Sequence, residues 1–141
     1  MNGVVDLLAD ARSGIRRYNP AEAPARAANG SVLVDLRSHD EREREGVIPG
    51  SVHVPRSVLE WRVDEHSGFA NPHVAQRDLE LILVCNEGYS SSLAAAGLRD
   101  LGFSRAADLA GGFQAWRAAD LPTIPAPPQS EGLPGMGGPD R

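Results

Sequence analysis

One short apolar stretch constrains the fold more than any other part of this sequence. Residues 79–84 read Leu-Glu-Leu-Ile-Leu-Val, and polar residues follow directly after Cys85. Dense apolar runs of this length are typical of strands that a parallel sheet buries on both faces. Three serines and an alanine-rich stretch then predict a helix from residue 90 to about residue 101. A buried strand that leads through a loop into a helix is the repeating unit of α/β folds.

The same alternation recurs along most of the chain. Apolar runs predict further strands at residues 31–36, 51–54 and 105–109. Apolar spacing and capping residues predict helices at residues 4–15, 20–28, 38–46, 58–61 and 113–119. Residues 64–78 have no periodicity and predict a loop. The sequence therefore predicts an α/β domain with a mainly parallel central sheet and helices on both faces.

The chain divides by composition into three parts. Its 141 residues suit one domain. Residues 1–16 form the expected N-terminal helix, and residues 17–122 form the expected domain. From Pro122 onward, ten of twenty residues are proline or glycine, which predicts a disordered tail over residues 123–141.

Composition excludes several classes of function. All 14 basic residues are arginine, and 19 acidic residues give a net charge of -5, which argues against a general nucleic-acid binder. The absence of lysine excludes Schiff-base chemistry and a lysine-containing phosphate loop. A single cysteine excludes an intramolecular disulfide and a multi-cysteine zinc site, and the histidines lack metal-ligand spacing. We expect no metal and no cofactor.

The sequence predicts neither a membrane helix nor a secretory signal. No run approaches the ~18 apolar residues that a membrane span requires. The N-terminus has no basic region before its short apolar stretch. We therefore expect a cytoplasmic protein, in which a free thiol stays reduced.

The loop that follows Cys85 is the candidate functional site. Ligands of parallel α/β sheets bind outside the carboxyl ends of the strands. The first amides of the following helix have no intrahelical partner and favour an anion, so a cysteine there should have a pKa below about 8.5. Gly88 lets the backbone curl inward, and Ser90, Ser91 and Ser92 add hydroxyl groups. The alternative is that Cys85 serves only as a small buried apolar residue.

Four segments together resemble the rhodanese homology family, most closely its small single-domain bacterial members. They are an Asp-x-Arg strand end at residues 34–37, a Gly-x-Ile-Pro-Gly segment at 46–51 with Val-Pro at 54–55, the cysteine loop at 85–90, and a Gly-Gly-x-x-x-Trp segment within 109–116. They occur in the order typical of the family.

The resemblance implies a sulfurtransferase that acts through Cys85. Its thiolate would attack the outer sulfur of a donor such as thiosulfate, release sulfite and keep a persulfide, which a thiophilic acceptor then removes. The implied partners are a small sulfur donor and an acceptor, which can be a protein. The implied binding residues, whose amides would hold the persulfide and the donor anion, are Asn86, Glu87, Gly88, Tyr89, Ser90 and Ser91.

The loop departs from the usual family pattern in its charge. Many members place an arginine or lysine in it, whereas residues 86–92 contain no basic side chain and include Glu87. A carboxylate beside an anionic donor costs about 1 kcal/mol at close range. We expect compensation from Arg37 or Arg56, each of which follows a predicted strand. Asp35 is interpreted as a structural residue that orients Arg37 or a loop amide.

Two other functions stay open. The domain can serve as a persulfide carrier or as a regulatory interaction module with little turnover of free thiosulfate. The family fold also includes phosphatases, which clamp phosphate with a loop arginine. No arginine follows Cys85 until Arg99, so the phosphatase reading is disfavoured. The sequence leaves the oligomeric state open and is compatible with a monomer.

Overall fold

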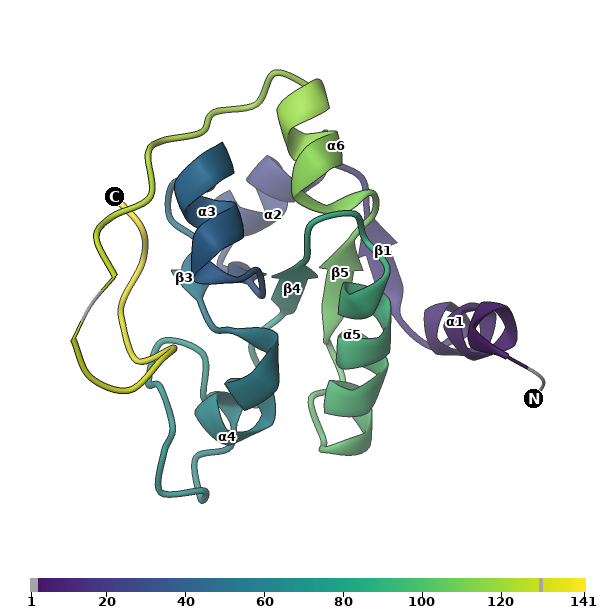
Figure 1. Ribbon diagram of the computed structural model, residues 1–141. Coiled ribbons are helices and arrows are strands. Elements are labelled where there is room, and N and C mark those ends of the chain that lie inside the picture. Colours follow the sequence, from purple (N-terminus) through teal and green to yellow (C-terminus); the bar gives the residue numbers. More distant parts are fainter. Residues whose placement is uncertain (1–2, 130) are drawn as a thin grey trace.

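A parallel sheet forms the centre of the computed structural model, which describes residues 3–129 and 131–141 (Figure 1). Within those residues the strand order is β1-β5-β4-β2-β3, and every strand pair is parallel. The strands are β1 (Arg16–Tyr18), β2 (Val32–Asp35), β3 (Val52–His53), β4 (Leu81–Val84) and β5 (Ala107–Leu109). The helices are α1 (Val4–Ser13), α2 (Ala23–Ala28), α3 (His39–Glu45), α4 (Leu59–Val63), α5 (Ser90–Asp100) and α6 (Gly112–Ala118), with a 3-10 turn at Arg56–Val58.

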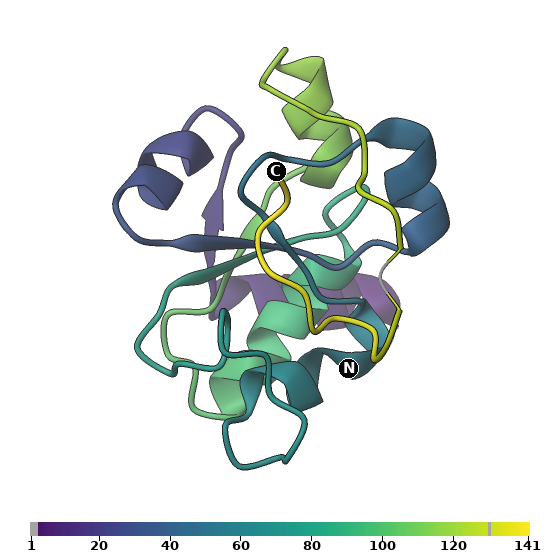
Figure 2. The same ribbon diagram turned by 90° about the vertical axis from the view of Figure 1, so that its left-hand side faces the viewer.

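The central strand β4 contributes to two apolar cores, one on each face of the sheet. Leu81 and Leu83 point into a core that α4 and α5 cover. Ile82 and Val84 point into a second core, which includes residues of α2 and α6. Figure 2 shows helices on both sides of the sheet. The apolar run at residues 79–84 was therefore correctly interpreted as a strand buried on both faces.

The predicted fold class is confirmed, with one strand missed. The strands expected at residues 31–36, 51–54, 79–84 and 105–109 form β2 to β5 in shortened versions, and residues 64–78 contain no helix or strand. Strand β1, between α1 and α2, was not predicted. It lies at the edge of the sheet beside β5 and reads Arg-Arg-Tyr, of which only Tyr18 is buried. Three residues with two charges provide no apolar run that would indicate a strand.

The tail after Pro122 contains no helix or regular strand in its described residues, but it contacts the domain. Asn71 Nδ2 donates to the carbonyls of Gly135 and Gly137 at 2.8 and 2.9 Å. The Asp140 side chain is buried and pairs with Arg42. A high proline and glycine content indicates that a segment lacks regular helices and strands. It does not indicate whether one side chain of that segment, such as the Asp140 carboxylate, is buried against the domain. The division of the chain at residues 16 and 122 stays a prediction.

A buried group of charges joins the end of β2 to α3 and the tail. The Asp35 carboxylate accepts from Arg37 Nε at 3.0 Å and Nη2 at 2.9 Å, and from Arg42 Nη1 at 2.8 Å. Arg42 also binds Asp140. Burial raises the pKa of Asp35, but the hydrogen bonds and charges of the two arginines outweigh it and leave that pKa below its usual value. Asp35 thus orients Arg37, as the sequence suggests.

Candidate active site

Cys85 lies at the carboxyl end of β4, just before the loop that leads into α5. Its side chain is 7% exposed. The Gly88 amide donates to Cys85 Sγ at 3.1 Å, and the Ser91 amide donates to the same sulfur at 3.4 Å. Two backbone amides therefore converge on the sulfur, an arrangement that stabilises negative charge there.

These contacts change the acidity of the thiol. Burial raises the pKa of Cys85, whereas hydrogen bonds from the Ser91 and Ser90 hydroxyls and from the Ser91 and Gly88 amides lower it. The hydrogen bonds prevail, and the pKa of Cys85 lies below its ordinary value. A larger fraction of the cysteine is then thiolate at neutral pH, and the thiolate is the nucleophilic form.

A close backbone approach supports the cysteine loop from behind. The carbonyls of Cys85 and Asn86 accept from the amides of Phe113 and Gln114 at 2.9 and 3.0 Å. A Cβ at Gly112 would lie 2.4 Å from the Cys85 carbonyl oxygen. Only glycine permits this approach of the first turn of α6 to the loop, which explains the second glycine of the Gly-Gly pair.

Gly88 has both a left-handed backbone and no room for a side chain. Its φ is +86°, and a Cβ there would lie 2.6 Å from the Gly111 amide nitrogen. We expect Gly88→Ala to destabilise the fold by at least about 1–2 kcal/mol, the conformational penalty alone. The displaced loop should also withdraw an amide from the sulfur and slow alkylation of Cys85 at neutral pH.

The matched control for Gly88→Ala is Gly68→Ala. Gly68 has a φ of +82°, but no atom lies within 4 Å of the position of its Cβ. It should show a comparable conformational penalty and an unchanged alkylation rate. Equal alkylation rates in both variants would contradict the role of the Gly88 amide.

A buried carboxylate that the sequence analysis missed lies behind the cysteine. Asp108 of β5 is fully buried, and its Oδ2 accepts from the Ser91 and Ser92 hydroxyls at 2.8 and 2.7 Å. Arg17 of β1 pairs with Asp108 at 2.8 Å. An aspartate between Ala107 and Leu109 in an apolar strand was a usable signal, because a buried charge requires partners.

The Ser91 hydroxyl has two roles that depend on the state of the cysteine. Cys85 Sγ lies 3.3 Å from Ser91 Oγ. A hydroxyl carries one hydrogen, so while Ser91 donates to Asp108 it can only accept a hydrogen bond from the thiol. When the thiol loses its proton, the same hydroxyl can turn and donate to the sulfur. Ser91 can therefore bind both protonation states of Cys85.

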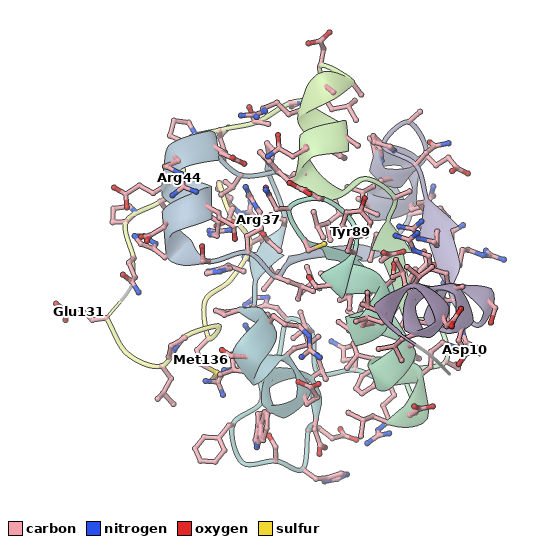
Figure 3. All side chains as sticks on the ribbon, turned by 45° about the vertical axis from the view of Figure 1, so that its right-hand side comes forward. Asp10, Arg37, Arg44, Tyr89, Glu131 and Met136 are labelled. Carbon is pink, nitrogen blue, oxygen red and sulfur yellow. The ribbon has the colours of Figure 1, made fainter. Side chains whose placement is uncertain are left out.

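The pocket in front of the sulfur gathers most of the predicted site residues. Its volume is about 370 Å³, and it is lined by Leu36, Arg37, Glu41, Cys85, Asn86, Glu87, Tyr89 and Ser90. Gly88 and Ser91 contact the sulfur itself. Figure 3 shows the labelled Arg37 and Tyr89 near each other at the carboxyl end of the sheet. Glu41, from the first turn of α3, was predicted as a helix-capping residue but not as a residue of the pocket.

The two arginines expected to balance Glu87 lie in different places. Arg56 does not line the pocket but pairs with Glu60 at 3.0 Å, so the structure does not bring it to the cysteine. Arg37 does line the pocket, although its guanidinium is buried over the Phe113 ring and is bidentate to Asp35. Its Nη1 has no hydrogen-bond partner, the only such buried side-chain atom among the described residues. Glu45 lies 3.8 Å from that atom.

The described part of the chain offers neither a metal site nor a membrane-spanning helix. Among residues 3–129 and 131–141, no group of three or more histidine, cysteine, aspartate or glutamate side chains is arranged to hold a metal ion. Within these ranges no helix has the length and apolarity needed to cross a membrane.

Known proteins share both the sequence pattern and the fold. The sequence pattern of the rhodanese-like domain matches residues 19–119. The thiosulfate sulfurtransferase GlpE of Pseudomonas savastanoi pv. phaseolicola is 38% identical over 105 residues, which cover 73% of this chain and 88% of that protein. The GlpE protein of Ectopseudomonas mendocina is 38% identical over 106 residues, covering 75% and 88%.

Solved structures agree with the sequence matches. A protein of unknown function from Rhodopseudomonas palustris, described as a possible tyrosine phosphatase, superimposes with a TM-score of 0.81 at 36% identity, covering 88% of this chain and 96% of that one. The human single-domain sulfurtransferase TSTD1 superimposes with a TM-score of 0.63 at 25% identity, covering 74% and 97%. Because the family pattern covers residues 19–119 and thiosulfate sulfurtransferases align over most of their length, the chain belongs to the rhodanese-like domain family and is a sulfurtransferase.

Proposed function

We propose that Cys85 carries the transferred sulfur as a persulfide, with thiosulfate as a donor. The observation that carries this proposal is the pair of amides on Cys85 Sγ, together with the lowered pKa of that thiol. The nucleophile is thus partly ionised before the donor binds, and the groups that stabilise its charge are already in place. A cytoplasmic location is part of the proposal, because a free thiol stays reduced there.

The proposed reaction has two steps, and each transfers one sulfur atom. In the first, the Cys85 thiolate attacks the outer sulfur of thiosulfate, a new S–S bond forms, and sulfite leaves with the electron pair of the broken S–S bond. In the second, a thiophilic acceptor attacks the outer sulfur of the persulfide, and the electron pair returns to Cys85 as thiolate. The Gly88 and Ser91 amides would stabilise the sulfur anion before and after each step.

The persulfide can be detected directly by mass spectrometry of the intact protein. After incubation with thiosulfate, we expect a mass gain of about 32 Da, one sulfur atom, that disappears when cyanide is added. A missing adduct with thiosulfate, accompanied by an adduct in the presence of a persulfidated protein donor, would favour the carrier function instead. The carboxylates of Glu41 and Glu87 at the pocket are the feature that favours this second candidate.

Phosphatase chemistry has less support. A phosphate clamp requires guanidinium groups at the loop. Arg99 is the first arginine after Cys85, but it lies in the last turn of α5 and donates to the Ser104 carbonyl at 2.7 Å. Its guanidinium therefore does not line the pocket.

We expect Glu87→Arg to lower the KM for thiosulfate by roughly threefold to tenfold. Glu87 is exposed at the pocket, and the substitution replaces a repulsion with an attraction of the order of 1 kcal/mol in a solvated site. The effect should shrink at high ionic strength, because salt screens exposed charges. Steady-state kinetics at low and high salt measure it.

Glu65→Arg provides the control for Glu87→Arg, since it makes the same change of charge on an exposed loop outside the pocket. Its KM for thiosulfate should match that of the unmodified protein. If Glu87→Arg leaves KM unchanged or raises it, Glu87 does not face the donor.

A further inference from the structure

Helix α1 lies outside the matched family region, yet it reaches the cysteine loop. It spans Val4–Ser13 and has no buried residue, and Val4, Val5 and Leu7 are exposed. It lies against α5, the helix that begins at the loop (Figure 1). Leu8 and Ala11 are half-buried, but no apolar side chain of α1 enters the core, so apolar burial alone accounts weakly for this position.

Two arginines from the N-terminal segment converge on one carbonyl of the cysteine loop. Arg12 Nη2 donates to the Gly88 carbonyl oxygen at 2.9 Å, and Arg17 Nη2 donates to the same oxygen at 3.1 Å. Arg12 also donates to the Ser92 hydroxyl at 3.1 Å and lies 5.7 Å from the centre of the Tyr89 ring. Arg17 is fixed by its ion pair with Asp108.

Holding this carbonyl fixes the amides of the loop. The Gly88–Tyr89 peptide is trans, so its N–H points opposite to its C=O. Because Arg12 and Arg17 bind the carbonyl, the Tyr89 N–H points away from their guanidinium groups. This peptide lies, in sequence, between the Gly88 and Ser91 amides that bind the sulfur. The two guanidinium groups thus orient part of the anion cradle without contacting the sulfur.

Of these two residues, Arg12 supplies positive charge that the loop lacks. No basic side chain occurs in residues 86–92. The charged groups that surround the cysteine from the neighbouring elements are Arg12 of α1, Arg17 of β1, Arg37 after β2, Glu41 of α3, Glu87 of the loop and Asp108 of β5. Arg17 is offset by Asp108 and Arg37 by Asp35. Arg12 instead directs its charge onto a neutral carbonyl, a hydroxyl and a ring.

We propose that Arg12 and Arg17 are positioning residues, through which the N-terminal segment holds the cysteine loop in its anion-binding shape and stabilises the ionised cysteine. The proposal adds positioning residues to the proposed sulfur-transfer site. Only its expected effect on kcat and KM rests on the proposed function. Arg12 is the better residue to test, because loss of Arg17 would also leave the buried Asp108 without its cation.

The test is the pH dependence of Cys85 alkylation by iodoacetamide in the full chain with Arg12→Gln. We expect the midpoint of the alkylation profile to rise by about half a unit, which makes alkylation roughly threefold slower below the midpoint. Arg12→Lys retains the charge but lacks the planar guanidinium that contacts two acceptors. Its alkylation midpoint should therefore lie between those of Arg12→Gln and the unmodified protein. In sulfur transfer, Arg12→Gln should lower kcat more than it raises KM, because Arg12 does not line the donor pocket.

Arg105→Gln is the matched control. It removes the same charge from an exposed arginine that donates to the Asp78 carbonyl, away from the pocket. A profile of Arg12→Gln that coincides with those of Arg105→Gln and the unmodified protein would overturn the proposal. Alkylation requires no sulfur donor, so a shifted profile in a protein that transfers no sulfur would reject the proposed function and leave this inference standing.

Discussion

Replacing Cys85 with serine is expected to abolish sulfur transfer. Serine keeps the size and the hydrogen-bonding position, but its hydroxyl is not ionised near neutral pH and cannot hold a sulfane sulfur. The chain contains one cysteine, so no second thiol can take over the reaction. Turnover should fall to background, and the mass gain after incubation with thiosulfate should disappear.

The fold should survive this substitution, because the Gly88 and Ser91 amides can donate to a serine oxygen in the same place. An unchanged far-ultraviolet circular dichroism spectrum and a similar melting temperature provide the control. Turnover in Cys85→Ser near that of the unmodified protein would show that sulfur transfer does not pass through this residue.

Replacing Asp35 with alanine is expected to destabilise the protein by about 3–5 kcal/mol, the usual cost of removing one partner from a buried ion pair. Asp35 is 3% exposed and is bound by Arg37 and Arg42, which are themselves buried. Without it, the carboxylates left near these arginines among the described residues are the more distant Glu45 for Arg37 and Asp140 for Arg42, and Arg37 keeps its hydrogen bond to the Gly46 carbonyl. Urea denaturation measures the change in the free energy of unfolding.

The control for Asp35→Ala is Glu60→Ala, which breaks the exposed pair between Arg56 and Glu60. Exposed pairs contribute at most about 1 kcal/mol, so this variant should be nearly as stable as the unmodified protein. A loss of less than about 1 kcal/mol in Asp35→Ala would show that the buried arginines are solvated or paired in another way.

The acid dependence of stability provides an independent check of the Asp35 contribution. The pKa of Asp35 is lowered in the folded state, so its contribution is present above the unfolded value of about 3.9 and is lost as pH falls through the lower folded value. Asp35→Ala should therefore lose less stability than the unmodified protein between pH 5 and strongly acidic solution. Parallel losses in both proteins would contradict the lowered pKa.

The parts of the fold that the sequence predicts are those with a local signal. The apolar run of β4, the reciprocal hydrogen bonds of Ser38 and Glu41 at the start of α3, and the loop at Gly88 each depend on neighbouring residues. The anion cradle around Cys85 follows from the same kind of signal, since a strand, a loop and a helix that are consecutive in sequence build it.

The parts that the sequence does not predict depend on pairs that are distant in the chain. Strand β1 exists because it pairs with β5, and nothing in Arg16–Tyr18 alone indicates a strand. Asp108 lacked an evident partner until the fold brought Arg17 beside it. The sequence offers both Arg37 and Arg56 as counter-charges to Glu87, but Asp35 holds Arg37 near the pocket, whereas Arg56 pairs with Glu60 outside it.

The pairing of the first strand with the last links the reactivity of the thiol to the completion of folding. Arg17 and Asp108 are 91 residues apart in the sequence, and Arg12 and Ser92 are 80 apart. Contacts of such separation form late, because the chain must close a long loop before it gains their stabilisation. The Gly88 and Ser91 donors are local to the loop, whereas we expect the Arg12 and Arg17 contacts to the Gly88 carbonyl to form only when the edge strand has docked beside β5.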